Sequence, residues 1–177
     1  MLYMAEQNEQ AAVLTVAQEM CAAIRTAPKA RGMDYIKTCV VTGQELEELA
    51  QKMEELFERY GEQFLARDAG CVRSSSAVVL AGVKNVYRGL NKVCGHCGFE
   101  DCNACSQAGG ECVYGPLDLG IALGSAVAIA ASRGIDNRIM FSVGRAAMEL
   151  GWLGKEYGCV MGIPLSVSGK SPFFDRK

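Results

Sequence analysis

The segment between Cys94 and Cys112 constrains this 177-residue chain more than any other feature, because it holds five of the nine cysteines. The order is Cys94-x2-Cys97-x4-Cys102-x2-Cys105-x6-Cys112, and glycines are frequent among the spacers. The segment has no hydrophobic periodicity, so it cannot build a core of its own and is expected to fold around a metal centre. We predict one domain over residues 1–177, with a Cys-rich metal-binding insert at 92–115.

The spacing of these cysteines favours an iron–sulfur cluster over zinc. A Cys-x2-Cys pair in a turn aims two thiolates at one point, and two more cysteines complete a tetrahedron that suits either metal. Gly95 and Gly98 are expected to let backbone N–H groups point at the sulfurs. Only four residues separate the two pairs, whereas zinc ribbons usually place about a dozen or more between theirs. The run from Cys97 to Cys105 also matches plant-type [2Fe–2S] spacing. Zinc in a structural or regulatory module without redox activity is the alternative.

Composition and charge narrow the class of protein. The chain is 50% hydrophobic and 21% charged, its formal net charge is −2, and it has no basic block. Binding to nucleic acid or to an anionic membrane is therefore not expected. No secretory signal is visible, and the apolar run Leu119–Ala131 is shorter than the about 20 residues that cross a bilayer. We expect a cytoplasmic protein, where dense cysteines indicate metal or redox chemistry rather than disulfides.

Hydrophobic patterns outside the insert predict an α+β fold. Apolar residues at helical spacing predict helices at Gln10–Ile24, after Thr42, at Asp118–Arg133 and at Ile139–Leu150, the last with Ile139 facing inward. Apolar β-rich runs predict strands at Ile36–Val41, Ala77–Val83 and Cys159–Ile163, the last ended by Pro164.

Single residues add local expectations. Thr42 and Glu45 form the pattern of a capping box, and Asp118 is expected to cap its helix. Asp136 and Asn137 are likewise expected to begin the helix that follows them.

Two further residues bear on chemistry outside the cysteine segment. Cys71, next to Gly70 in an expected loop, is the best candidate for a reactive thiol outside the insert. The single histidine, His96, lies between two cysteines and is expected to face solvent, which leaves no Ser–His–Asp arrangement.

The cysteine segment resembles the short four-cysteine [4Fe–4S] domain of anaerobic electron-transfer proteins, which runs Cys-Gly-x-Cys-Gly-x-x-x-Cys and then a later Cys. The matching residues are Cys94-Gly-His-Cys97-Gly-Phe-Glu-Asp-Cys102 and Gly109-Gly110-Glu111-Cys112. On this match the cluster ligands are Cys94, Cys97, Cys102 and Cys112. Cys105 is a rival for the fourth position, because the last cysteine follows sooner here than in that domain.

Most of the chain is also similar to a bacterial and archaeal family described as containing a ferredoxin domain, DUF2148. The similarity is carried by the cysteine segment, by Asp118–Ala126, by Asp136–Met140, and by Gly162–Ser166 with Gly169-Lys170 and Phe174-Asp175-Arg176. This resemblance implies an iron–sulfur electron-transfer protein and no particular reaction.

The segments on either side of the insert resemble FMN-binding nitroreductases. Ala27-Pro28-Lys29-Ala30-Arg31-Gly32 stands where those proteins have Ala-Pro-Ser-x-x-Asn. Asp118–Arg133 matches the long small-residue helix of their dimer core, and Gly162-Ile163-Pro164 resembles the Gly-x-Pro that ends their last core strand. The resemblance implies a nitroreductase-like sheet flanked by helices, a homodimer, and FMN at the subunit interface.

The chain departs from that pattern where nitroreductases hold the flavin. It has no N-terminal Arg-Arg-Ser-x-Arg block, and Lys29 and Gly32 replace the Ser and Asn of the motif. Because basic side chains pair well with phosphate oxygens, the alternative phosphate contacts are Arg25, Lys29, Arg31, Lys170 and Arg176. The hypothesis is a dimeric [4Fe–4S] electron-transfer protein that serves a redox partner protein or small molecule, with a flavin-linked oxidoreductase activity left open.

Overall fold

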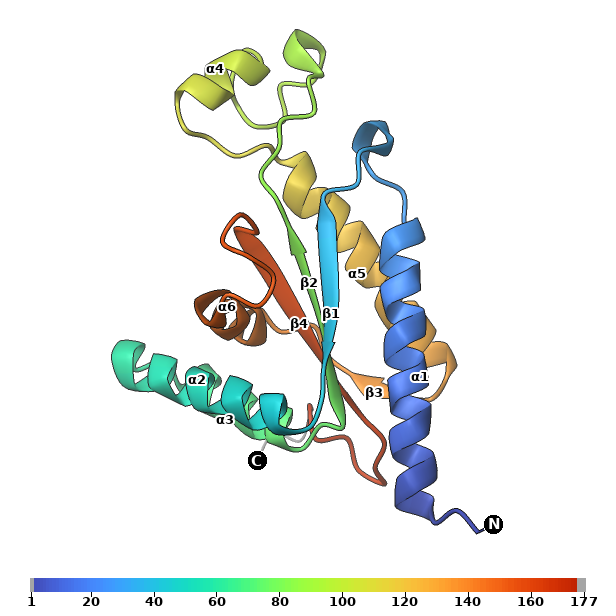
Figure 1. Cartoon of the computed structure of the whole chain (residues 1–177). Helices are drawn as coiled ribbons and strands as arrows, with labels where there is room; N and C mark the ends of the chain where they lie inside the picture. Colours follow the sequence, from blue (N-terminus) through green and yellow to red (C-terminus); the bar gives the residue numbers. More distant parts are fainter. Residues whose placement is uncertain (1, 175–177) are drawn as a thin grey trace.

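A four-stranded antiparallel sheet with the strand order β1-β2-β4-β3 forms the middle layer of the computed structural model, which describes residues 2–174 (Figure 1). β1 (Ile36–Val41) pairs with β2 (Ala77–Val83), and β2 pairs with β4 (Cys159–Ser166). The short β3 (Asp136–Asn137) pairs with the far end of β4. The predicted α+β class is confirmed, and β1 and β2 have the predicted bounds.

Helices cover both faces of the sheet, and they divide the core into two halves (Figure 1). The five long helices are α1 (Ala5–Thr26), α2 (Gln44–Tyr60), α3 (Gln63–Arg73), α5 (Tyr114–Ser132) and α6 (Phe141–Leu150). Successive side chains of a strand point to opposite faces, so Val79 packs in the half formed by α1 and α5. Val78 and Leu80 pack in the half formed by α2, α3 and α6. β2 is buried along its whole length because it separates these two halves.

The starts of two helices differ from the prediction. α2 begins after Gly43, whose φ of 63° turns the chain in a way that glycine allows without strain, and no side chain caps this helix. The predicted capping box of Thr42 and Glu45 is therefore wrong. Asp118 is also no cap, because α5 begins four residues earlier at Tyr114 and buries this carboxylate in its second turn.

The region around Cys71 is a helix rather than the expected loop. Cys71 lies in α3, is buried, and donates its Sγ–H to the carbonyl of Pro172 at 3.6 Å. Burial, followed by the charge of Asp68, raises the pKa of this thiol above its ordinary value. Since the thiolate is the reactive form, the expectation of a reactive thiol at Cys71 is wrong.

The last third of the chain also corrects three local predictions. Asp136 and Asn137 form β3 instead of beginning α6, and Ile139 is exposed rather than inward-facing. β4 continues through Pro164 to Ser166. The backbone N–H and C=O of Gly162 both bond to Met140, on the side of β4 that faces β3. In an antiparallel strand the backbone groups of residues two positions apart face the same side, so those of Pro164 face β3 as well. The missing N–H of Pro164 therefore falls on that side and leaves the pairing with β2 intact.

By length and composition alone, α5 is long and apolar enough to cross a membrane. This corrects the expectation that the apolar run Leu119–Ala131 is too short to do so, because the helix extends beyond that run. Among residues 2–174 it is the one helix that meets this test, and core helices meet it as well. Leu119, Leu123 and Ala126 on its inner side pack in the core half that α5 shares with α1. Its apolar character is thus explained on the inner side by burial, whereas its outer side stays exposed.

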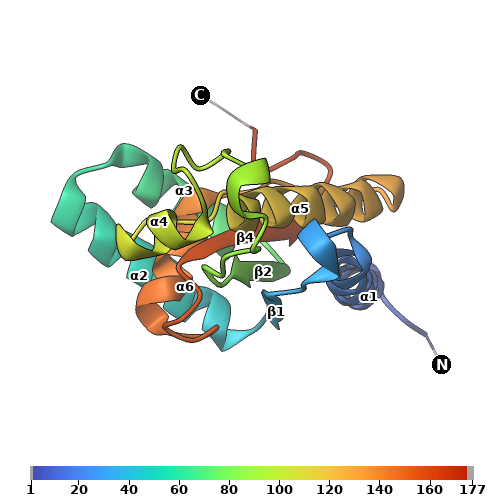
Figure 2. The same ribbon diagram turned by 90° about the horizontal axis from the view of Figure 1, so that it is seen from above.

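The cysteine segment connects the end of β2 to the start of α5 and projects beyond one end of the sheet (Figure 1). It contains a 3-10 turn at Asn91–Val93 and a short helix, α4 (Cys102–Gln107). Seen from above, α4 lies on the side of the molecule where α2, α3 and α6 lie, away from α1 (Figure 2). The fold therefore presents the cysteines at one end of the molecule.

Candidate metal centre

All five cysteines of the segment line one pocket. Cys105 and Cys112 are buried, while the other three are half-buried. The remaining wall is mostly apolar or aromatic and includes Tyr87, Leu90, Phe99 and Tyr114. Cysteines that are up to eighteen positions apart in sequence are thus brought to one place.

Short local structures hold these cysteines. Gly95 and Gly98 have φ values of 61° and 81°, which turn the chain on both sides of Cys97. The Asp101 carboxylate caps α4 by accepting the N–H of Ala104 at 2.8 Å. That cap fixes the helical turn on which Cys102 and Cys105 lie three residues apart and share a face.

One backbone N–H group donates to a cysteine sulfur in this pocket. The N–H of Asn91 lies 3.4 Å from Sγ of Cys102. Hydrogen bonds to sulfur stabilise a thiolate and tune a metal bound to it. The N–H of Gly98 instead donates to the carbonyl of Gly95 at 3.1 Å, which closes the turn around Cys97.

Cys105 differs from the other cysteines in its environment. It is fully buried, and its Sγ–H donates to the carbonyl of Glu111 at 3.8 Å. Burial, a hydrogen bond with Cys97, and the neighbouring Cys112 and Cys102 raise the pKa of this thiol to about 11. At neutral pH Cys105 therefore stays a neutral thiol in the protein without metal.

The donor set fits a metal centre by its chemistry, since several soft thiolate ligands share one largely apolar pocket. Within residues 2–174, no three Cys, His, Asp or Glu side chains are grouped closely enough to hold a metal ion as they stand. The fit thus rests on the shared pocket and on the contact between the Asn91 N–H and Sγ of Cys102. It does not rest on a set of ligands that is already assembled.

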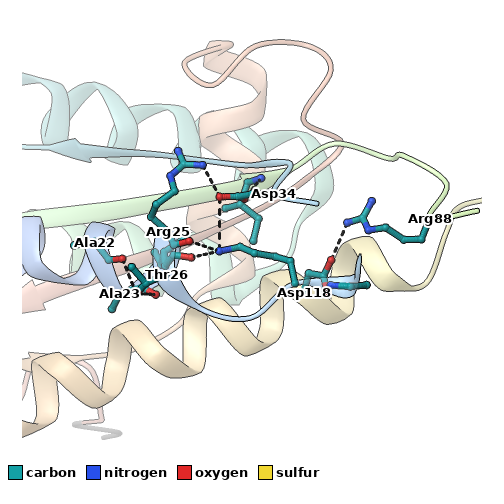
Figure 3. Close-up of polar contacts among 11 residues, drawn as sticks. Ala22, Ala23, Arg25, Thr26, Asp34, Arg88 and Asp118 are labelled. Atoms are coloured by element: carbon teal, nitrogen blue, oxygen red, sulfur yellow. Dashed lines mark hydrogen bonds and ion pairs between the residues drawn. The ribbon is translucent and has the colours of Figure 1, made fainter. Parts of the chain in front are cut away.

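A buried ion pair lies at the wall of this pocket (Figure 3). The guanidinium of Arg88 is 2.8 Å from the carboxylate of Asp118, and the two side chains are only 1% and 3% exposed. The second oxygen of Asp118 accepts the N–H of Ala30 at 2.9 Å, and Nη1 of Arg31 donates to the carbonyl of Arg88 at 2.6 Å. These bonds join three parts of the chain: the residues between β2 and the cysteine segment, α5, and the loop after α1.

Sequence reasoning missed this ion pair. The available signal was Asp118 itself, a carboxylate within an apolar helix of small residues. A buried carboxylate needs a partner, but the sequence does not say which of the many basic residues supplies it.

Besides Arg31, two more of the basic residues predicted to contact a flavin phosphate have partners within the protein. Nζ of Lys29 donates to the carbonyls of Ile24 and Arg25 at 2.6 and 2.7 Å, so this buried ammonium caps the C-terminus of α1. Arg25 pairs with Asp34 at 2.5 Å (Figure 3). Both residues therefore have a structural role in this region.

The structure does not bring the predicted phosphate contacts together within one chain. Arg25, Lys29 and Arg31 precede Ile36, which pairs with Val83 at one end of the sheet. Lys170 follows Ser166 at the other end, and strands of this length span about 20 Å. Arg176 lies outside the described residues.

Comparison with known structures shows that the fold is that of nitroreductases. An FMN-bound nitroreductase from Bacteroides fragilis is similar over 100% of this chain and 84% of its own, with a TM-score of 0.62 and 14% identity. A nitroreductase family protein from Clostridium novyi covers 86% of this chain and 73% of its own, with a TM-score of 0.59 and 15% identity. The NADPH:FMN oxidoreductase of Vibrio harveyi, solved with NAD+, covers 92% of this chain and 63% of its own, with a TM-score of 0.57 and 15% identity.

Comparison of sequences identifies the family. An uncharacterized protein of Archaeoglobus fulgidus is 46% identical over 165 residues, which cover 89% of this chain and 88% of the relative. Residues 108–176 match the family model described as an uncharacterized protein containing a ferredoxin domain. The match includes Cys112 and Asp118, whereas the other four cysteines of the segment precede it. On this evidence the chain belongs to the ferredoxin-domain family DUF2148.

Proposed function

We propose that this protein is a cytoplasmic iron–sulfur electron-transfer protein in which Cys94, Cys97, Cys102 and Cys112 hold one [4Fe–4S] cluster. The observation that carries the proposal is the convergence of the five cysteines on one pocket at the end of the fold. The ferredoxin domain in the family description and the oxidoreductases among the structural neighbours support a redox role. A bound cluster of this kind takes up and releases single electrons.

The environment of Cys105 supports its assignment as the cysteine that is not a ligand. Cys105 is fully buried, with no exposed surface. Its Sγ–H already has an acceptor in the carbonyl of Glu111. Cys112 lines the same pocket and its backbone N–H is held by Asn85 at 3.1 Å, so we propose Cys112 as the fourth ligand.

The position of the pocket suits exchange of electrons with another molecule. Three of its cysteines are half-buried rather than fully enclosed, and the neighbouring Val93 is 94% exposed. A redox partner protein or a small molecule approaching this end of the fold thus comes close to the metal centre.

We propose FMN as a second cofactor, on the likeness of the fold to nitroreductases. Because Lys29 is buried and caps α1, whereas the Arg25 side chain is 61% exposed beside Asp34, the phosphate contacts proposed here are Arg25, Arg31, Lys170 and Arg176. Arg31 and Lys170 lie at opposite ends of the sheet, so a single flavin site that uses both needs a second copy of the chain.

Purification without oxygen tests both cofactors. We expect four iron and four sulfide per chain, the composition of one cubane cluster, and FMN in the supernatant after denaturation. Metal and sulfide analysis and flavin fluorescence measure these quantities. Zinc without sulfide would contradict the cluster and support the structural module, and a supernatant without flavin would remove FMN from the proposal.

We also propose that the protein is a homodimer formed through the outer side of α5. Leu117 and Ile121 are 47% and 42% exposed, and Gly124 and Ala128 continue the same face one and two turns later. A continuous apolar stripe that stays exposed is typical of a surface that packs against another protein. Small residues in the stripe allow a second helix to approach closely.

Ile121→Asp is expected to convert the dimer into a monomer, because it places a charge at the centre of the stripe. Sedimentation velocity at matched concentrations measures the change. The control is Phe141→Asp, since Phe141 is also an exposed apolar side chain but begins α6 on the other side of the sheet. A dimer that survives Ile121→Asp, or one that Phe141→Asp dissociates, would contradict this interface.

A further inference from the structure

We propose that Arg88 raises the reduction potential of the cysteine centre by presenting the positive end of a buried ion pair to the pocket. The inference rests on the proposed function, because it concerns the potential of the cluster held there. Arg88 lines the same pocket as the five cysteines, whereas its partner Asp118 does not. The ion pair is therefore oriented, with Arg88 at the pocket wall and the carboxylate of Asp118 behind it, where its second oxygen accepts the N–H of Ala30.

The charge of Arg88 matters because the pocket offers little other compensation. Among the described residues that line it, Arg88 is the one with a positive side chain. The other charged side chain, Asp101, is negative and accepts the N–H of Ala104. Thiolates gathered in one pocket repel one another. A fixed cation at the wall offsets part of that repulsion.

Arg88 is held firmly enough to act as a fixed charge. Nη1 donates to the carbonyl of Val86 at 2.7 Å, Nη2 pairs with Asp118, and the guanidinium lies 5.0 Å from the ring centre of Tyr35. Nε of Arg88 is buried and has no hydrogen-bond partner among the described residues. A buried donor without an acceptor is costly.

The sign of the effect follows from charge. Reduction adds one negative charge to the centre, and a nearby positive charge in a buried site favours the more negative form. Arg88 therefore stabilises the reduced state, while Asp118 opposes it from a greater distance. Removing the charge of Arg88 is therefore expected to lower the reduction potential. Removing the charge of Asp118 is expected to raise it.

An anaerobic redox titration of four variants tests this inference. For Arg88→Gln, we expect the ratio of reduced to oxidised centre at a fixed potential to fall about tenfold, which is 59 mV for a one-electron couple. Asp118→Asn should raise the ratio, and the double variant should lie between the two single ones. Arg88→Lys keeps the charge and should stay close to the wild type.

Iron and sulfide content is measured on each sample, so the possible failures are distinguishable. A wild-type protein that binds neither element removes the proposed function. Loaded variants that share one potential, or that shift in the same direction, overturn the role of Arg88 and leave the proposed function standing. If Arg88→Gln does not hold the centre, Asp118→Asn decides: a higher potential supports the inference, and an equal or lower one overturns it.

Discussion

Replacing Cys112 by serine is expected to lower the bound iron at least about tenfold, since even changes outside the ligand shell weaken metal binding tenfold or more. A cubane cluster needs four thiolates, and the ordinary serine hydroxyl does not ionise at neutral pH. The same substitution at Cys105 is expected to leave the iron content unchanged. A serine hydroxyl at that position keeps a donor for the carbonyl of Glu111, which the Sγ–H of Cys105 now occupies.

The two variants are matched controls for each other. Both side chains are buried, both line the pocket, and the chemical change is identical. Iron and sulfide per chain after anaerobic reconstitution give the comparison, and circular dichroism verifies that both variants are folded. Loss of iron in Cys105→Ser with retention in Cys112→Ser would exchange the two roles. Retention in both would show that neither residue is a ligand.

Cys94→Ser and Cys97→Ser complete this series, because both residues belong to the expected ligand set under either assignment of the fourth position. If iron content is unaffected in both, the ligand assignment as a whole is wrong, even where Cys112→Ser gave the expected loss.

The parts of the fold that the sequence predicted are those set by local patterns. β1 and β2 were predicted with their exact bounds, because β1 is rich in β-branched residues and β2 is an unbroken run without polar side chains. α3 was missed although Leu65, Ala69 and Val72 recur at helical spacing, because Arg67, Asp68 and Gly70 interrupt the apolar pattern between them. Pro164 was interpreted as a strand end, but its backbone nitrogen lies on the side of β4 where pairing is already short.

The candidate site was predictable only in its composition. The cysteine spacing is a local signal and indicated metal chemistry from the sequence. The surroundings of the cysteines are not local: the N–H of Cys112 is held by Asn85, twenty-seven positions away. Arg88 and Asp118 are thirty positions apart, and no pattern in the sequence around either residue predicts that it pairs with the other. Long-range pairs of this kind depend on how α5 and the segment after β2 meet at the end of the sheet.

Gly144→Ala is expected to destabilise the protein by about 3 kcal/mol, the upper part of the range for overpacked cores. Gly144 lies in α6 where this helix crosses β4, and an added Cβ would stand 1.9 Å from the carbonyl oxygen of Val160. That atom belongs to a strand backbone paired with β2, so it cannot move aside as a flexible side chain does. Gly162 on β4 has the complementary role, since a Cβ there would meet Val143 of α6 at 2.2 Å.

The matched control is Gly70→Ala, which places the same methyl group in α3, where no atom lies within 4 Å. Alanine is favoured over glycine in helices, so this variant should gain about 0.5–1 kcal/mol. Urea unfolding of reduced, metal-free protein measures both, and for a chain of this size the loss in Gly144→Ala corresponds to about 6–12 °C in melting temperature. Equal stability of the two variants would show that α6 does not pack this closely on β4. Because the cysteine segment is attached to β2 and α5 rather than to α6, iron bound per folded chain should not change in either variant.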